Sequence, residues 1–445
     1  MKRLFGTDGL RAVAGEFPLD VPSVRRLGGA LAKLLGEEGL PPRVLLGRDT
    51  RESGEEIEKA VTRGLRGAGG ETASAGVVPT AAVAYLVKRW GFSAGIVISA
   101  SHNPYRDNGI KIFSGEGFKI PDLWEARLEE AILDGGPVAD AGESGVETDP
   151  LFLESYVRSL AERSSLEGPA RPLKVVLDCA HGAGSKAAPE AMRKAGLEVI
   201  STADAPDGRN INAGCGALHP ERLAAAVIEH RADLGVAYDG DADRALWVDE
   251  GGRILTGDHT LYVLGRAMLE ANRLKAGAVV ATTMSNLGLQ KAVEALGLRF
   301  ERTKVGDKYV LERMLDLGAN LGGERSGHTI LLDEATTGDG ILTSLKMIEV
   351  MAARRMPLSA LVEGYVEYPQ VLLNVPVSTK PDLGRFPEIV SAIREAEGVL
   401  RGTGRLDVRY SGTEPLARVM VEGEDAAEVE RLARRISEAI ARRLS

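Results

Sequence analysis

Apolar and polar positions follow one pattern three times along the chain: an apolar strand, a turn, an amphipathic helix, a glycine and a second strand. The runs that form these copies are 44–49 and 53–66, then 173–178, 185–195 and 197–201, then 278–282, 287–296 and 298–302. Alternating strands and helices are typical of mixed or parallel sheets with helices on both faces. The pattern predicts three related α/β domains.

The last part of the chain has a different pattern. Strands are expected at 371–377, 406–410 and 417–422, followed by a closing helix near 425–443. The apolar residues of that helix, Val429, Leu432, Ile436 and Ile440, fall on one face. We therefore expect a smaller C-terminal α+β domain.

Composition and charge narrow the range of partners. The chain has 445 residues, of which 44% are hydrophobic and 27% charged, as is typical of soluble globular proteins with several domains. A formal net charge of −9 disfavours nucleic acid or a membrane surface as the main partner. No signal-peptide core and no apolar run of about 20 residues is found, so the expected compartment is the cytoplasm.

A serine follows the apolar strand at 95–100. Asn103 precedes Pro104 and is therefore biased to an extended backbone, so the strand cannot run smoothly into a helix. The stretch 107–109 is a turn signal, and 110–113 is a second strand. Ser101 is therefore expected near the end of a β-α or hairpin crossover, where sites gather in α/β sheets. Taken alone, a serine in a turn is the more common explanation.

Three carboxylates stand at alternate positions after the strand at 234–238: Asp239, Asp241 and Asp243. Alternate residues in an extended loop point the same way, and three clustered anions repel one another without a cation. Oxygen ligands alone favour Mg²⁺ or Ca²⁺ over zinc. An EF-hand is disfavoured because Arg244 stands where that loop needs glycine and because the flanks are strands. A solvated acidic turn is the remaining alternative.

Two further loops carry polar groups suited to a sugar phosphate. In 322–328, glycines allow close approach of the backbone, and Glu324 and Ser326 can bond sugar hydroxyls. In 409–415, the backbone around Ser411, Gly412 and Thr413 can form an anion nest. Arg409 and Arg418 add forked hydrogen bonds suited to phosphate. Each loop alone is also explained as a plain turn or an arginine-rich strand edge.

Together, a hydroxyl nucleophile, a hard-cation site and anion-binding loops are the minimum equipment for moving a phosphoryl group. The four elements occur in order, one in each expected domain, and resemble the phosphoserine, metal, sugar and phosphate loops of the α-D-phosphohexomutase superfamily. The supporting stretches are 5–11, 98–104, 215–221, 304–310 and 323–328. The match is closest to the bacterial phosphoglucosamine mutase family and covers essentially the whole chain. It departs at Arg325, where glutamine is usual, and at Ala217-Leu218, where a Ser-Thr pair is usual.

The resemblance implies a fold of three related α/β domains with mixed sheets plus the smaller C-terminal domain, all around a central cleft. The expected domains are 1–152 with the phosphoserine loop, 153–252 with the metal loop, 253–366 with the sugar loop and 367–445 with the phosphate loop.

The implied reaction interconverts glucosamine 6-phosphate and glucosamine 1-phosphate, for UDP-N-acetylglucosamine and cell-wall synthesis, through a phosphoserine and a 1,6-bisphosphate. Ser101, as phosphoserine, would ligate Mg²⁺ together with the three aspartates, and Arg244 would add positive charge. Lys304 and His328 are the general acid–base candidates, with His102 and Lys111 beside the serine; a lysine in a cationic cleft can have a lowered pKa. Glu324 and Ser326 would bind the sugar. Arg409, Ser411, Gly412, Thr413 and Arg418 would hold the phosphate that does not react.

The resemblance implies Mg²⁺ as cofactor and a hexose or hexosamine 1,6-bisphosphate as activator. The implied partner is a small sugar phosphate. The sequence does not give the oligomeric state and leaves a homodimer open. Two alternatives stay open: a phosphomannomutase/phosphoglucomutase, and a non-catalytic sugar-phosphate binding protein. Mere binding needs neither the serine nor all three aspartates.

Overall fold

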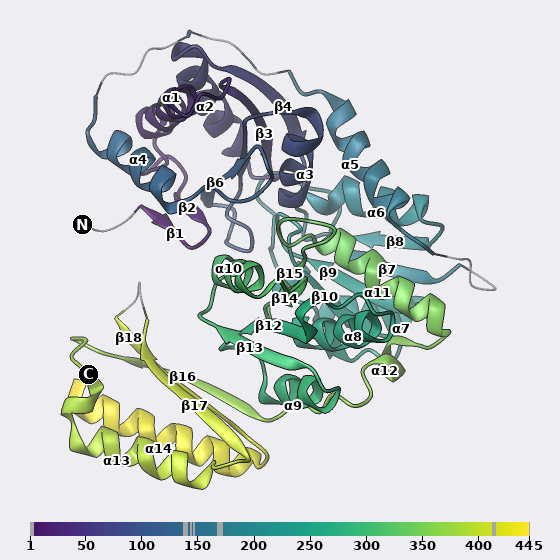
Figure 1. The fold of residues 1–445 in the computed structure, drawn as a ribbon, viewed down its shortest axis with the longest axis vertical. Coiled ribbons are helices and arrows are strands. Elements are labelled where there is room, and N and C mark those ends of the chain that lie inside the picture. The colour runs from purple at the N-terminus through teal and green to yellow at the C-terminus, as the bar shows by residue number, and fades with distance from the viewer. Residues whose placement is uncertain are drawn as a thin grey trace. The chain divides into compact units, whose positions relative to one another are not determined.

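A computed structural model describes residues 4–136, 141, 142, 145, 147–166, 172–411 and 415–444. The chain forms two compact units (Figure 1). The first comprises Met1–Met284 and Leu298–Glu363, and the second Ser285–Gly297 and Gly364–Ser445.

The first sheet of the larger unit has six strands in the order β1-β2-β6-β5-β3-β4. Its strands are β1 (Phe5–Gly6), β2 (Gly9–Val13), β3 (Arg43–Arg48), β4 (Glu71–Val77), β5 (Ala94–Ile98) and β6 (Asp107–Ser114), with helices α1 (Val21–Glu37), α2 (Gly54–Gly67), α3 (Thr80–Trp90) and α4 (Asp122–Leu133). Strand β3 is parallel to β4 and β5, whereas the pairs β5–β6, β6–β2 and β2–β1 are antiparallel.

Helices cover both faces of this sheet. Apolar residues of α1, α2 and α4 share one core with residues of β3 and β5, including Leu27, Leu31 and Val44. On the opposite face Gly47 and Gly95 leave room for Val83 of α3, because a Cβ at either glycine would lie 2.6 Å from that side chain. Every residue of β5 is buried, as expected for a strand covered on both faces.

The second sheet has the order β11-β10-β9-β7-β8 and the third the order β13-β12-β14-β15. The second comprises β7 (Lys174–Asp178), β8 (Glu198–Thr202), β9 (Leu234–Tyr238), β10 (Ala245–Asp249) and β11 (Ile254–Leu255), with α5 (Pro150–Glu162), α6 (Gly184–Lys194) and α7 (Glu221–His230). The third comprises β12 (Ala278–Thr282), β13 (Arg299–Thr303), β14 (Leu321–Gly323) and β15 (Thr329–Leu331), with α8 (Gly257–Glu270), α10 (Asp307–Leu317), α11 (Gly340–Arg354) and α12 (Leu358–Leu361). Both sheets mix parallel and antiparallel pairs, which confirms the predicted α/β class.

The smaller unit has an antiparallel sheet in the order β16-β18-β17. Its elements are α9 (Leu287–Ala295), β16 (Gln370–Pro376), α13 (Pro387–Val399), β17 (Gly404–Tyr410), β18 (Leu416–Gly423) and α14 (Ala426–Leu444). The four apolar residues predicted to share one face of the closing helix are all buried in the core of this unit. The predicted α+β domain is confirmed.

One local prediction is wrong. The stretch 107–109 is not a turn but the start of β6, where it pairs with residues 11–13 of β2. The local turn signal is overridden because β2 supplies an antiparallel partner that is distant in sequence. Gly109 suits this place, since a Cβ there would lie 2.5 Å from the carbonyl oxygen of Ser99 and 2.7 Å from that of Leu10.

Among the described residues, no helix is both long and apolar enough to cross a membrane.

Candidate functional site

Ser101 lies just beyond the end of β5, at the start of the connection to β6. Its φ of 51° is in the left-handed region, which costs a non-glycine residue about 1–2 kcal/mol. Its backbone N–H donates to Ser99 Oγ at 2.9 Å, and its own hydroxyl donates to Asp239 Oδ2 at 2.5 Å. The side chain is buried. Strained backbone at a hydroxyl that faces a carboxylate marks a candidate reactive group.

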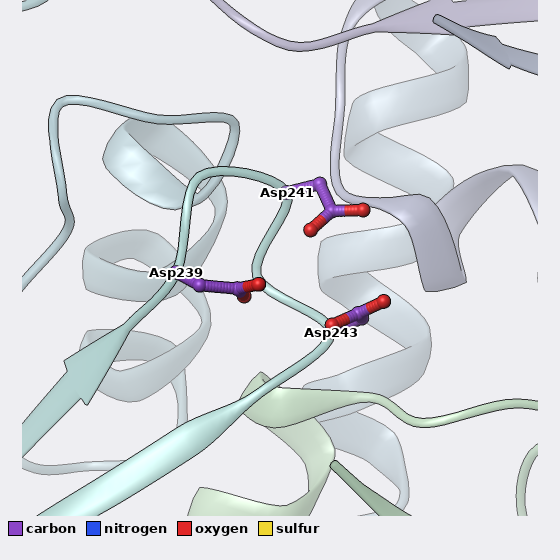
Figure 2. Close-up of side chains that lie close together, drawn as sticks. All are labelled: Asp239, Asp241 and Asp243. Atoms are coloured by element: carbon purple, nitrogen blue, oxygen red, sulfur yellow. The ribbon is translucent and has the colours of Figure 1, made fainter. Parts of the chain in front are cut away.

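The three predicted aspartates converge in the turn between β9 and β10 (Figure 2). One carboxylate oxygen from each lies within 4.8 Å of the others, and all three residues are buried. The loop is not extended as expected, because Ala242 has a φ of 55° and turns the chain. The flanking elements are strands, as predicted, which excludes an EF-hand.

The donor set fits a hard divalent cation. Asp241 Oδ1 is buried and accepts no hydrogen bond within the described part of the chain, whereas Asp243 Oδ1 faces His328 Nδ1 at 3.5 Å. Buried carboxylate oxygens without a donor are costly unless a cation neutralises them. Burial, together with Asp243 and Asp241, raises the pKa of Asp239 well above its usual range. These residues can therefore hold a metal bound through oxygen.

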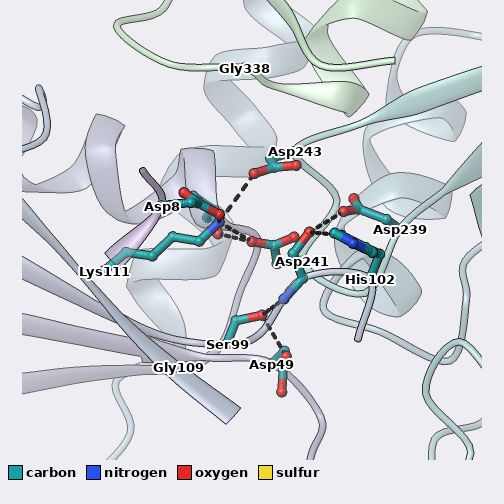
Figure 3. A network of polar contacts seen from close by, with 12 residues as sticks. Asp8, Asp49, Ser99, His102, Gly109, Lys111, Asp239, Asp241, Asp243 and Gly338 are labelled. Atoms are coloured by element: carbon teal, nitrogen blue, oxygen red, sulfur yellow. Dashed lines mark hydrogen bonds and ion pairs between the residues drawn. The ribbon is translucent and has the colours of Figure 1, made fainter. Parts of the chain in front are cut away.

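Lys111 of β6 lies among the carboxylates (Figure 3). Its Nζ is 2.8 Å from Asp241 Oδ2, 3.2 Å from Asp243 Oδ2 and 3.0 Å from Asp8 Oδ2. Burial opposes the charged form, but the three carboxylates outweigh it and hold the pKa of Lys111 well above its usual range. The expectation of a lowered lysine pKa is therefore wrong at Lys111, because anions rather than cations surround it.

The charge network extends beyond the metal loop. Asp8, between β1 and β2, also contacts Lys119 at 2.6 Å, and Lys119 contacts Asp307 at 2.6 Å at the start of α10. Asp307 Oδ2 lies 3.7 Å from His328 Nε2. Lysines and carboxylates thus alternate from the first sheet of the larger unit to the third.

His328, between β14 and β15, faces the metal loop. Its Nδ1 lies 3.5 Å from Asp243 Oδ1, and its Nε2 accepts the backbone N–H of Gly338 at 3.1 Å. Burial lowers the pKa of His328, but Asp243, Asp307 and Glu324 outweigh it and raise the pKa to about 9. The Gly338 bond opposes this rise, because a protonated ring has no lone pair at Nε2. That bond favours the neutral tautomer with its proton on Nδ1.

His102 and Arg244 lie together beside Ser101. Arg244 Nη1 lies 3.1 Å from His102 Nδ1, and Ser101 Oγ lies 3.4 Å from the same nitrogen. Burial, with Arg244 and Arg11, lowers the pKa of His102 to about 4. A neutral His102 can accept the guanidinium N–H of Arg244 at Nδ1, which agrees with the lowered pKa of His102. Arg244 Nε lies 3.9 Å from Asp239 Oδ2 and 3.8 Å from Asp243 Oδ1.

The glycine-rich loop at 322–328 carries the carboxylate of Glu324. Glu324 is buried, and its Oε1 accepts the backbone N–H of Gly306 at 3.1 Å. Arg325 pairs with the buried Asp258 of α8 at 3.1 Å, and Ser326 is exposed. Lys304 is also exposed, with its Nζ 5.8 Å from the ring centre of Tyr309. Lys304 is not among the residues that the structure gathers around Ser101.

The arginine-rich loop belongs to the smaller unit. Arg409 and Arg418 are direct partners across β17 and β18. Ser411 is buried; its Oγ lies 3.4 Å from Arg418 Nη2, and its carbonyl accepts from Lys380 at 2.6 Å. Gly412 and Thr413, also expected to bind phosphate, lie outside the described residues. The hairpin thus brings two guanidinium groups and a hydroxyl to one end.

Several residues around Ser101 and the aspartates have no role predicted from the sequence: Asp8, Arg11, Asn103, Lys119, Asp307, Arg51 and Asn212. Arg11 contacts Asp8 at 2.5 Å and Asn103 Oδ1 at 3.3 Å. Asp8 and Arg11 lie in a stretch, 5–11, that supported the family resemblance, and Asp307 lies in another, so a signal was present there. Arg51 and Asn212 gave no signal, because their role depends on contacts with a distant loop.

Comparisons with known proteins agree across the chain. Four family models match, each described as a part of phosphoglucomutase/phosphomannomutase: domain I at residues 2–137, domain II at 154–252, domain III at 256–368 and the C-terminal domain at 372–439. The chain is 46% identical over 447 residues to the phosphoglucosamine mutase of Solibacter usitatus. The alignment covers 100% of this chain and 99% of the relative.

Two solved structures show the same fold. A phosphoglucomutase/phosphomannomutase family protein from Burkholderia thailandensis has a TM-score of 0.81 and 25% identity, covering 98% of this chain and 96% of that one. N-acetylphosphoglucosamine mutase from Aspergillus fumigatus, in complex with GlcNAc-6P and magnesium, has a TM-score of 0.69 and 18% identity, covering 100% and 96%. At that identity the second likeness concerns the fold alone.

Proposed function

The chain belongs to the phosphoglucosamine mutases of the α-D-phosphohexomutase family, and on that premise we propose that Ser101 carries the phosphoryl group exchanged between the 6 and 1 positions of glucosamine phosphate. The observation that carries this proposal is the 2.5 Å contact between Ser101 Oγ and Asp239 Oδ2. A hydroxyl held against a cluster of metal-type carboxylates is suited to accept and release phosphate.

The proposed exchange has two balanced halves. In the first, the bond between phosphorus and Ser101 Oγ breaks and a bond to the free sugar hydroxyl oxygen forms, giving the 1,6-bisphosphate. The sugar hydroxyl gives its proton to a base of the site, and Ser101 Oγ gains a proton as it leaves. In the second, after the bisphosphate turns round, Ser101 Oγ gives up its proton to the site and takes the other phosphoryl group, and the sugar oxygen that loses this phosphoryl group gains a proton. A trace of 1,6-bisphosphate restores any enzyme that loses its phosphate.

The metal proposed for this site is Mg²⁺, held by Asp239, Asp241, Asp243 and the phosphate on Ser101. The orphaned buried oxygen of Asp241 supports it, as does the all-oxygen donor set. When bound, Mg²⁺ supplies positive charge that stabilises the transferring phosphoryl group. Arg244 and Lys111 contribute fixed positive charge of the chain itself at the same place.

Lys304 and His328 are both proposed for general acid–base work. His328 is buried beside the metal loop, and its contacts with Asp243 and Gly338 hold the ring in one orientation. Lys304 is exposed. The high pKa of Lys111 suits it to hold charge rather than to exchange a proton at neutral pH.

Glu324 and Ser326 are proposed to bind the sugar, and Arg409, Ser411, Gly412, Thr413 and Arg418 the phosphate that does not react. The Gly306 N–H donates to the Glu324 carboxylate and so positions it. A carboxylate in this place would bind a sugar that bears an ammonium group more strongly than one that bears only hydroxyls. Because Arg325 is paired with Asp258, its positive charge is offset beside Glu324.

The test is a panel of glucosamine, glucose and mannose phosphates at fixed Mg²⁺ with a trace of hexose 1,6-bisphosphate. The proposal predicts the highest kcat/KM for glucosamine phosphates. Better turnover of mannose phosphates would favour the phosphomannomutase alternative. Binding without turnover of any sugar would favour the non-catalytic alternative.

A further inference from the structure

The Ser101 loop is tied down by one buried arginine. Arg51 follows β3, and its side chain is completely buried. Its guanidinium uses all five N–H groups: Nε on Asp49, two at Nη1 on the carbonyls of Pro104 and Asp107, and two at Nη2 on the carbonyls of Ser101 and Asn103.

The contacts of Arg51 with the Ser101 loop are at hydrogen-bond distance. Arg51 Nη2 lies 3.0 Å from the Ser101 carbonyl oxygen and 2.9 Å from that of Asn103. Arg51 Nη1 lies 2.9 Å from the Asp107 carbonyl oxygen. Four backbone carbonyls that lie within 101–107 therefore converge on one planar group, which only a fork of fixed geometry can satisfy.

Asp49, the acidic partner of Arg51, holds the same loop from the other side. Its Oδ2 lies 2.9 Å from Arg51 Nε and accepts the Ser99 hydroxyl at 2.6 Å. Ser99 Oγ in turn accepts the backbone N–H of Ser101. The N–H and the C=O of Ser101 are thus both fixed by the Asp49–Arg51 pair, at the residue whose φ is 51°.

A second side chain, from the second sheet's part of the larger unit, binds the same loop. Asn212 Nδ2 donates to the Ser101 carbonyl at 2.9 Å and to the Asn103 carbonyl at 3.2 Å, which are the two carbonyls that Arg51 Nη2 also binds. The turn that carries the three aspartates packs closely against the Ser101 carbonyl. A Cβ on Gly240, in that turn, would lie 2.5 Å from the Ser101 carbonyl oxygen.

We propose that Arg51 and Asn212 are positioning residues that hold the Ser101 backbone in its left-handed conformation and so set the distance from its Oγ to the metal loop. This inference rests on the proposed function of Ser101. The guanidinium of Arg51 and the amide nitrogen of Asn212 both bond to the protein itself, and both contact the carbonyl of Ser101. Small errors in the placement of a reacting group can cost about 100-fold in rate.

The experiment compares Arg51→Lys and Asn212→Ala with the wild type in the glucosamine phosphate assay. Lysine keeps the charge of Arg51 but has three donors at one point, so it cannot span four carbonyls. Arg48→Lys is the matched control, because Arg48 ends β3 nearby but pairs with Glu55 and Glu58 instead. Rates are normalised to the Ser101 phosphorylation measured by intact mass, and folding is followed by thermal unfolding.

We expect kcat to fall by about 100-fold in Arg51→Lys and about tenfold in Asn212→Ala, with KM within about threefold of the wild type. The control should keep its rate. Two results would overturn the inference: kcat within about threefold of the wild type in the folded variants, or a rise of KM at unchanged kcat. If Arg51→Lys does not fold, the Asn212→Ala arm decides. An inactive wild type would instead defeat the proposed function, and this inference with it.

Discussion

Ser101 Oγ and Asp239 Oδ2 lie 2.5 Å apart, although 138 residues separate them in the chain. The contact joins the first sheet of the larger unit to the turn between β9 and β10 of the second. Left-handed backbone at both Ser101 and Ala242 allows the two loops to meet.

Asp241→Asn should weaken activation by Mg²⁺ by about tenfold or more while the protein stays folded. The substitution removes one of three clustered charges at nearly constant shape, so the cost falls mainly on the metal. Mg²⁺ titration of activity, alongside thermal unfolding, measures both effects. Asp333→Asn, at an exposed carboxylate paired with Lys275, serves as the control. Unchanged Mg²⁺ dependence would mean that the acidic loop is merely a turn.

Arg418→Ala should raise KM for the sugar phosphate by about tenfold or more, with a further loss of kcat allowed. A hydrogen bond to a charged group contributes about 1.5–3 kcal/mol, which is the basis of that figure. Arg431→Ala, an exposed arginine on α14 of the same unit, is the matched control. Equal KM values for Arg418→Ala and the wild type would place the phosphate elsewhere.

Glucosamine phosphates should be preferred over glucose and mannose phosphates in kcat/KM, with some turnover of glucose phosphates. The carboxylate of Glu324, which we propose binds the sugar, would favour an ammonium over a hydroxyl and would also bind hydroxyls common to all three sugars. Arg325→Gln is a second arm of the experiment: because Asp258 already offsets Arg325, the preference should change little. A large gain in glucosamine preference in this variant would show that the charge of Arg325 acts directly on the bound sugar.

His102 should remain neutral at and above pH 6, titrating with a midpoint of about 4 in NMR spectra of the imidazole. Since this pKa lies below the usual value for histidine, the unfolded chain binds more protons between pH 6.5 and 4, and stability falls as pH decreases through that window. Arg244→Met should raise the midpoint, because the guanidinium that disfavours protonation is removed. A midpoint near 6.5 in the wild type would contradict the burial and charge described here.

Local patterns were enough to predict the strand and helix runs and the groups that follow the strands. The alternation of apolar and polar residues predicted the α/β domains, and the burial of Val429, Leu432, Ile436 and Ile440 confirms the face of the closing helix. The convergence of the three aspartates was also predicted, although the loop turns at Ala242 rather than running extended.

Features that depend on distant contacts could not be predicted. Residues 107–109 have the composition of a turn, but β2 recruits them into a strand. The pKa of Lys111 rises because Asp8 and the metal loop meet it in space, which no local pattern reveals. Arg51 and Asn212 likewise act on carbonyls of a loop far away in the sequence.

The most direct test of the central claim is mass spectrometry of the active protein, intact and as peptides, combined with the activity of Ser101→Ala. We predict one phosphate, located on Ser101, which exchanges with added hexose 1,6-bisphosphate. We also predict that Ser101→Ala loses mutase activity without loss of folding. A stable phosphate on another residue, together with full activity in Ser101→Ala, would contradict the account.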